Sequence, residues 1–299
     1  MAPSYKAQDL FNANGLVALT TGGGGGIGLY AVWALDAIGA KAVYIMGRCE
    51  PNASGCRQDC DQWHSQANRW RCDRQGFTPE GGQLNAPGAR LHQPAVCKCR
   101  YLRTKTRRCI IWKAHHKEIQ EAWLNPDMDD FTKTQHVHIT AVFYTIVTFL
   151  DLLDAGNKKR NLSQDSQILV TSSVSGFSRT LFSGVAYPAS KAVVNHIVTT
   201  LSTFSAQNNF RIRANIIAPS LFPSELTSGF IDYLDQFTSE GHEGVLPDAR
   251  KIDPGFAPAA CTGSEEDFAG LILFLASRAD AYINGEAILI DGGRASLVQ

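Results

Sequence analysis

The chain has 299 residues, of which 44% are hydrophobic, and its 28 basic and 28 acidic side chains give a formal net charge of zero. A chain of this length can bury a sizeable core in one α/β domain. The balanced charge gives no general attraction to nucleic acid or to an anionic membrane. No apolar run reaches the roughly 20 residues of a membrane span, and the first ten residues lack the apolar segment of a secretory signal. We therefore expect a soluble, cytoplasmic protein.

Residues 16–46 have the alternating pattern of an α/β fold. Continuous apolar runs at 16–20 and 42–46 predict two buried strands, and the apolar spacing over 27–38 predicts a helix between them. Gly39 follows that helix at the position where a glycine commonly ends one. Buried strands that alternate with helices indicate a parallel sheet covered on both faces.

A glycine-rich loop joins the first strand to this helix. Glycines let the backbone turn tightly and let a pyrophosphate approach without Cβ atoms in the way, and the N–H groups of the helix N-terminus then hold the anion. A flexible loop without a ligand is the alternative interpretation, but the position between a buried strand and a helix favours phosphate binding. The residues that we expect to contact the dinucleotide are Thr21, Gly22, Gly24, Gly25, Gly26, Ile27 and Gly28.

The second strand is followed by Gly47 and Arg48. Enzymes that use NAD place an acidic residue near this point to bind the ribose hydroxyls. A 2′-phosphate would instead meet the Arg48 guanidinium, so the sequence favours NADP(H), with NAD(H) as the alternative cofactor. The other interpretation of Arg48 is a solvated loop cation.

Residues 49–117 interrupt the pattern. Seven of the eight cysteines lie here, aliphatic residues are few, and neither strand nor helix periodicity is visible, so we expect an irregular or disordered segment. Three origins stay open: an out-of-frame or unspliced translation, a divergent insertion, and a zinc or nucleic-acid module. The module has little support, because Cys56 and Cys60 have the spacing of zinc ligands but no second clean pair accompanies them. We predict no metal site.

Regular periodicity resumes near residue 118. The sequence predicts helices over 128–156, 187–205 and 264–277, and strands at 167–171, 213–217 and 287–290. With the N-terminal elements, these predict a single Rossmann-type domain over 1–299: a doubly wound parallel β-sheet with helices on both faces.

Tyr187 and Lys191 are spaced i and i+4, which places both side chains on one face of the predicted helix. An ammonium next to a phenol favours the phenolate, so the pair suits proton transfer at a reacting oxygen. Ser172 and Ser173 follow the strand at 167–171, and open α/β sheets bind ligands at the carboxyl ends of their strands. These four residues are therefore candidates for one catalytic site.

The motifs TGGGGGIG, SSVSG, YPASK, RANIIAP and IDGG occur in the order found in short-chain dehydrogenases/reductases, and the sequence resembles that family over about residues 15–48 and 118–293. The resemblance implies that Tyr187 exchanges the proton at the substrate oxygen. It also implies that Lys191 binds the nicotinamide ribose and that Ser173, the second serine of its pair, polarises the substrate oxygen.

The loop after the strand at 213–217 is expected to contact the nicotinamide end of the cofactor. The resemblance places Pro219, Leu221 and Ser224 there, with Ser224 at the carboxamide. The family usually has glycine after the proline, whereas this chain has Ser220. Because serine lacks the freedom of glycine at positive φ, we expect this loop to be shifted.

Two further positions depart from the family. The asparagine that helps hold a proton-relay water is matched by His138, so this histidine is either a fourth catalytic residue or a helix residue without a chemical role. The Asn-Asn-Ala-Gly segment of the fourth strand has no counterpart in 49–117.

These features predict an NADP(H)-dependent oxidoreductase that interconverts a carbonyl and a secondary alcohol by hydride transfer. A nucleotide-binding or scaffold protein that has lost turnover is the alternative, because of the departures above. The apolar composition of 222–258 favours a hydrophobic small-molecule substrate, and neither nucleic acid nor a membrane is an expected partner. The resemblance also implies a homodimer or homotetramer. Its contact face would include Phe143, Phe149 and Leu150, and the alternative is that these residues belong to the intramolecular core.

Overall fold

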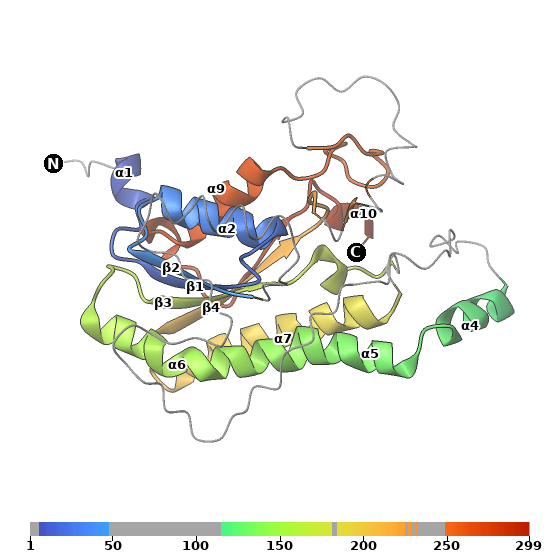
Figure 1. Cartoon of the computed structure of the whole chain (residues 1–299), viewed down its shortest axis with the longest axis horizontal. Coiled ribbons are helices and arrows are strands. Elements are labelled where there is room, and N and C mark those ends of the chain that lie inside the picture. The colour runs from blue at the N-terminus through green and yellow to red at the C-terminus, as the bar shows by residue number, and fades with distance from the viewer. Residues whose placement is uncertain are drawn as a thin grey trace. The chain divides into compact units, whose positions relative to one another are not determined.

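The computed structural model describes residues 6–47, 115–180, 184–224, 227–228, 231 and 249–298 (Figure 1). Arg48 and the irregular segment therefore lie outside the described residues, except for the last three positions of 49–117, where a helix begins. The described elements fall into two compact units, which are taken in turn below. The expectation of a single domain over the whole chain stays a prediction.

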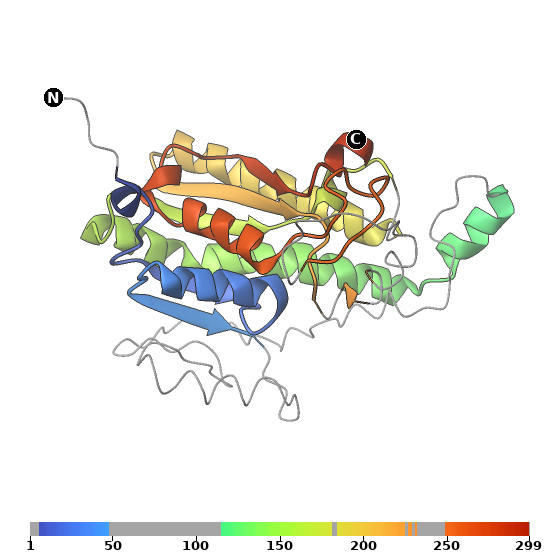
Figure 2. The same cartoon turned by 90° about the horizontal axis from the view of Figure 1, so that it is seen from above.

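The first unit contains α1 (Ala7–Leu10), β1 (Val17–Thr21), α2 (Gly26–Ala37), β2 (Ala42–Met46) and α9 (Glu265–Leu275). Strands β1 and β2 pair in parallel, with Val17 opposite Ala42 and Thr21 opposite Met46. Helix α2 packs against α9 (Figure 2). Gly39 has a φ of +83° just after α2, so it ends the helix as the sequence predicts.

The second unit is built on three parallel strands in the order β3-β4-β5. Strand β3 (Ser166–Thr171) pairs with β4 (Ile212–Pro219), which also pairs with β5 (Ala287–Ile290). Every residue of β4 is buried, including the polar side chains of Arg213 and Asn215. All three strands lie where the sequence places them, and all described strand pairs are parallel. The α/β class is thus confirmed.

One long helical run and one further helix pack around the β3-β4-β5 sheet. The run consists of α5 (Met128–Gln135), η2 (His136–Thr140) and α6 (Ala141–Lys159), and α7 (Ala186–Gln207) lies alongside α5 and η2 (Figure 1). The sequence predicts a single α-helix here, but η2 is a π-helical turn within it. The shared core includes Ile146, Val170, Val194, Val198 and Ile216. The unit also contains two short helices, α4 (His116–Leu124) and α10 (Ala295–Val298).

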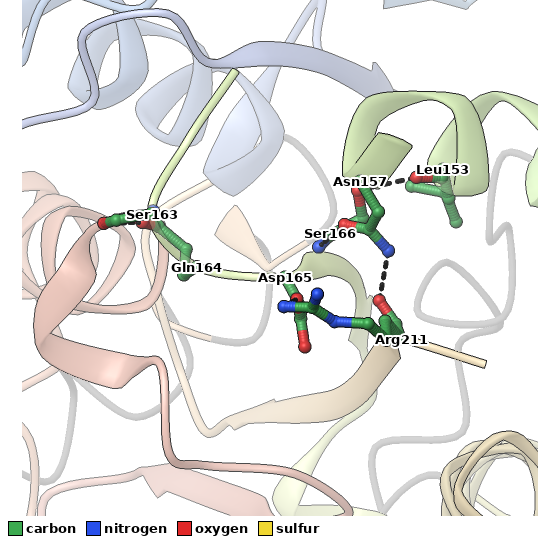
Figure 3. Close-up of polar contacts among 7 residues, drawn as sticks. All are labelled: Leu153, Asn157, Ser163, Gln164, Asp165, Ser166 and Arg211. Atoms are coloured by element: carbon green, nitrogen blue, oxygen red, sulfur yellow. Dashed lines mark hydrogen bonds and ion pairs between the residues drawn. The ribbon is translucent and has the colours of Figure 1, made fainter. Parts of the chain in front are cut away.

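Side chains at the end of α6 fix the start of the sheet (Figure 3). Asn157 accepts a hydrogen bond from the Ser166 N–H through Oδ1 at 2.7 Å, and its Nδ2 donates to the carbonyl of Arg211. Arg211 also forms an ion pair with Asp165 at 2.5 Å. Since Ser166 and Ile212 are the first paired residues of β3 and β4, these contacts set the strand register.

A buried amide joins the three strands. Asn215 is fully buried in β4, and its Nδ2 donates to Gln167 Oε1 at 2.8 Å and to the carbonyl of Ile283 at 3.0 Å. Its Oδ1 accepts from the N–H of Glu286 at 3.0 Å. The three bonds connect β4 to β3 and to the segment that enters β5.

The run Met128–Lys159 presents an apolar outer face. Phe143, Tyr144, Val147 and Leu152 are between 39% and 63% exposed. By length and composition alone, this is the one described helix long and apolar enough to cross a membrane. A search for an unbroken apolar sequence misses it, because polar residues are scattered through the run.

Candidate active site

Tyr187 and Lys191 lie one turn apart near the start of α7. The Lys191 Nζ atom is 5.7 Å from the centroid of the Tyr187 ring and donates a hydrogen bond to the carbonyl of Thr171 at 3.1 Å. Thr171 is the last residue of β3. The helix therefore brings a phenol and an ammonium to the carboxyl end of a parallel strand, as the sequence predicts.

The serine pair lies between β3 and α7. Ser173 begins the short 3-10 helix η3 (Val174–Gly176), where its Oγ accepts a hydrogen bond from the Ser175 N–H at 3.2 Å. Ser172 instead donates its Oγ hydrogen to the carbonyl of Lys191 at 3.4 Å. The Ser173 hydroxyl thus acts as an acceptor within the turn, so its proton can be donated to a ligand oxygen. This difference favours Ser173 over Ser172 as the group that polarises a substrate.

His138 lies on the π-helical turn η2 and faces α7. Its Nδ1 is 3.0 Å from the Oγ of Ser190, and its ring meets the Tyr187 ring edge-on with centroids 5.4 Å apart. Burial lowers the pKa of the His138 imidazole to about 4, and the positive charge of Lys191 contributes to this lowering. His138 is therefore neutral at physiological pH and belongs to the same cluster as Tyr187 and Lys191. π-helical turns occur frequently at functional sites.

Sequence reasoning missed Ser190 and the carbonyl of Thr171. Ser190 is fully buried and donates its hydroxyl to the carbonyl of Tyr187 at 2.7 Å. Its place three residues after Tyr187, on the same helical face, was the available signal. The bond to His138 depends on the π-helical turn, which the sequence does not reveal.

The glycine-rich loop of the first unit has the geometry of a phosphate cradle. Helix α2 begins at Gly26, and its cap residue, Gly25, has no side chain that could bond to the N–H groups of the first turn. Cβ atoms built on Gly22, Gly24 and Gly25 would meet nothing within 4 Å, so open space adjoins the N–H groups of the first helical turn. A Cβ atom on Gly28 would lie 2.4 Å from the carbonyl oxygen of Gly22, so that glycine permits close packing of helix and strand.

These observations fit a dinucleotide. The open space accommodates a pyrophosphate, and the helix N-terminus attracts its charge. Thr21 is the last residue of β1, and Ile27 lies in the first turn of α2. All the residues predicted for this loop thus lie around the helix N-terminus. Arg48, the residue predicted to select NADP(H), lies outside the described residues.

Two contacts of the loop after β4 bear on the residues expected at the nicotinamide end of the cofactor. Ser220 has no positive φ and donates its N–H to the carbonyl of Ile290 at 3.0 Å, so serine causes no backbone strain there. Ser224 Oγ lies 2.9 Å from Thr227 Oγ1, a partner that the sequence reasoning did not include. Pro219 is the last residue of β4, and Leu221 is buried in a cluster with Ile231, Ile252, Phe256 and Ala257.

Known proteins resemble this chain in sequence and in fold. A family model described as enoyl-(acyl carrier protein) reductase matches residues 112–295. The short-chain dehydrogenase/reductase PhomF of Diaporthe leptostromiformis is 34% identical over 307 residues, covering 99% of this chain and 97% of PhomF. The chain belongs to the short-chain dehydrogenase/reductase family. The rhamnolipids biosynthesis 3-oxoacyl-[acyl-carrier-protein] reductase of Pseudomonas aeruginosa is a more distant relative, 26% identical over 283 residues, with 95% and 97% of the two chains covered.

Solved structures of short-chain dehydrogenases/reductases show the same fold. The Pseudomonas aeruginosa RhlG/NADP active-site complex has a TM-score of 0.64 and 23% sequence identity, and covers 96% of this chain and 99% of its own. A gluconate 5-dehydrogenase from Burkholderia cenocepacia, in complex with NADP and tartrate, has a TM-score of 0.63 and 20% identity, with coverages of 97% and 99%. The Rossmann-type fold predicted from the sequence is thus confirmed.

Proposed function

We propose that this short-chain dehydrogenase/reductase uses NADP(H) to interconvert a carbonyl and a secondary alcohol by hydride transfer. The observation that carries the proposal is the cluster at the carboxyl end of β3. There Tyr187 and Lys191 lie one turn apart on α7, and Ser172 ties the Ser173 turn to the same helix. This set provides a proton donor, a fixed positive charge and a hydroxyl for the substrate oxygen.

In the reductive direction, a reduced nicotinamide cofactor, once bound, would be the source of the hydride for the carbonyl carbon. The Tyr187 hydroxyl gives its proton to the carbonyl oxygen as the new C–H bond forms, which leaves a secondary alcohol and a phenolate. The Lys191 ammonium stabilises that phenolate. Ser173 donates a hydrogen bond to the same oxygen and so stabilises the charge that develops on it. Oxidation of the alcohol runs through the reverse proton transfer.

The glycine-rich loop would hold the pyrophosphate of the cofactor, and Pro219, Leu221 and Ser224 would lie at its nicotinamide end. Both solved structures compared above are NADP complexes, which supports a nicotinamide cofactor. The preference for NADP(H) over NAD(H) rests on Arg48 as the partner of the 2′-phosphate. Replacing Arg48 with alanine should weaken NADPH binding and leave NADH binding almost unchanged. An equal loss for both cofactors would contradict this role.

For the substrate we propose a hydrophobic small molecule with a ketone or a secondary alcohol. The apolar composition of 222–258 supports this class, and its described part contributes buried apolar side chains to the cluster around Leu221. We further propose that the protein works in the cytoplasm, without nucleic acid as a partner.

The first experiment is thermal unfolding of the purified chain with and without NADPH or NADH. A ligand at 100 times its Kd stabilises the folded state by about 2.7 kcal/mol. A panel of hydrophobic ketones then tests turnover through the consumption of NADPH. The variant Tyr187→Phe should keep the NADPH-dependent shift and lose turnover. A shift without turnover on any ketone or alcohol would favour the alternative, a nucleotide-binding protein without catalysis.

We also propose that the protein forms a homodimer or homotetramer through the apolar face of α6. The sequence predicts Phe143, Phe149 and Leu150 for this face. Phe143 is 39% exposed and lies on the outer face. Leu150 packs against the core cluster instead, and the exposed apolar side chains next to Phe143 are those of Tyr144 and Val147. Light scattering should give a dimer or tetramer for the wild type and a smaller species for Tyr144→Glu. A wild-type monomer would contradict the proposal, and binding to neutral lipid vesicles would favour a membrane instead.

A further inference from the structure

Ser190 connects the catalytic tyrosine to His138. Its hydroxyl oxygen lies 2.7 Å from the carbonyl oxygen of Tyr187 and 3.0 Å from His138 Nδ1. Ser190 is fully buried on α7, so solvent does not compete for these bonds. This connection links the π-helical turn η2 to the first turns of α7.

The hydrogen-bond inventory fixes the tautomer of His138. A carbonyl oxygen can only accept, so Ser190 gives its single hydroxyl proton to Tyr187. Ser190 must therefore accept from His138, which requires the hydrogen to be on Nδ1. Since the imidazole is neutral, its second nitrogen, Nε2, carries a lone pair and is an acceptor.

The same imidazole contacts the catalytic phenol. The rings of His138 and Tyr187 meet edge-on, with an interplanar angle of 81° and centroids 5.4 Å apart. Tyr187 and Lys191 are the titratable residues of α7 that lie near this ring. A charged imidazole would add a second positive charge beside Lys191, whereas the neutral ring packs against the phenol without adding a charge.

We propose that Ser190 is a positioning residue that locks His138 in the Nδ1–H tautomer, and that the locked ring orients the Tyr187 phenol and presents Nε2 as a hydrogen-bond acceptor in the active site. The catalytic part of this inference rests on the proposed reductase function. The tautomer itself does not, because it follows from the contacts among Ser190, His138 and the Tyr187 carbonyl.

The tautomer is tested by nuclear magnetic resonance on the full chain labelled with ¹⁵N-histidine. The chain has eight histidines, and the signals missing in His138→Asn assign the ring. The wild type should show a protonated Nδ1 and an unprotonated Nε2 at neutral pH. Ser190→Ala should shift the ring toward the Nε2–H tautomer, and Ser190→Thr should restore the wild-type signals. A wild-type ring in the Nε2–H form, or a tautomer unchanged by Ser190→Ala, would overturn the lock.

Turnover tests the consequence for catalysis. Ser190→Ala should lower kcat about fivefold to tenfold and leave KM nearly unchanged, because the loss of one hydrogen bond changes a rate by about this factor. Ser205→Ala is the matched control, because Ser205 is another buried serine at the far end of α7, and it should retain the wild-type kcat. An altered tautomer with a wild-type kcat would overturn the positioning role. Absence of turnover in the wild type would refute the proposed function instead, and the spectra would still decide the tautomer.

Discussion

Replacing Gly176 with alanine is expected to impair catalysis by moving the Ser173 turn away from α7. A Cβ atom at position 176 would lie 2.9 Å from the carbonyl carbon of Lys191, 2.9 Å from Asn195 Nδ2 and 3.1 Å from the backbone nitrogen of Ala192. Two of these atoms belong to the backbone of a 22-residue helix, so they cannot yield easily. The turn η3 therefore has to move.

The size of the effect follows from this crowding. Over-packing costs about 1–3 kcal/mol of folding free energy. At about 2 °C per kcal/mol for a chain of this size, Tm should fall by about 2–6 °C. Ser173 begins the turn that moves, and a displacement of about 1 Å costs on the order of 100-fold in rate. A shift of a few tenths of an ångström should then lower kcat about tenfold.

The assay compares Gly176→Ala with Gly270→Ala by thermal unfolding and by ketone reduction. Gly270 lies in α9, where a Cβ atom meets nothing within 4 Å. Alanine in a helix interior is about 1 kcal/mol more favourable than glycine, so this control should raise Tm and keep the wild-type kcat. If Gly176→Ala retains both the Tm and the kcat of the wild type, close packing of η3 on α7 does not set the geometry of the site.

Three further substitutions test other parts of the molecule. Asn215→Ala removes three buried hydrogen bonds, so chemical denaturation should show that the free energy of unfolding falls by about 3–5 kcal/mol. Asn161→Ala, at an exposed position, should leave the free energy of unfolding almost unchanged. Equal losses for the two variants would contradict the role of the Asn215 amide. Gly24→Val fills the space beside α2 and should abolish the NADPH-dependent rise in Tm without lowering the Tm of the free chain; a wild-type rise would exclude phosphate binding there. His138 has a pKa of about 4 in the folded chain against an ordinary value of 6.5, so the stability that its neutral form supports is complete above pH 6.5 and is lost as the pH falls toward 4. Between pH 6.5 and pH 4, the free energy of unfolding should therefore fall by about 2–3 kcal/mol less in His138→Gln than in the wild type. Parallel curves of the free energy of unfolding against pH for the two proteins would refute this.

The sequence predicts most described elements because their signals are local. Strand β4 is a mostly apolar segment that is buried on both faces, and α7 follows from apolar residues at helical spacing, so the local pattern of apolar residues predicts both. The i and i+4 spacing of Tyr187 and Lys191 likewise defines their shared helical face. The boundaries of these elements shift by one to three residues, because strand ends and helix ends depend on pairing and capping.

The parts that were missed depend on backbone conformations and contacts that form only in the folded chain. Nothing in the composition of residues 136–140 distinguishes a π-helical turn from an α-helical one, because the same residue types occur in both. The Ser190 bond to His138 joins residues 52 positions apart, and Ser224 gains Thr227 as a partner only through the folding of its loop. Serine at position 220 causes no backbone strain, because Ser220 has no positive φ, and a sequence motif does not give φ values.

Burial of His138 determines whether a histidine can take the place of the asparagine that the family has at this position. An asparagine side chain offers donors and an acceptor without a charge, whereas a histidine in water near neutral pH carries a partial positive charge. Burial and the nearby Lys191 ammonium lower the pKa of His138 to about 4, so the ring stays neutral and offers one donor and one acceptor, as an amide can. Ser190 takes the donor, which leaves Nε2 as the acceptor. Because the site removes the charge that would distinguish the two residues, histidine at this position is compatible with the proposed chemistry.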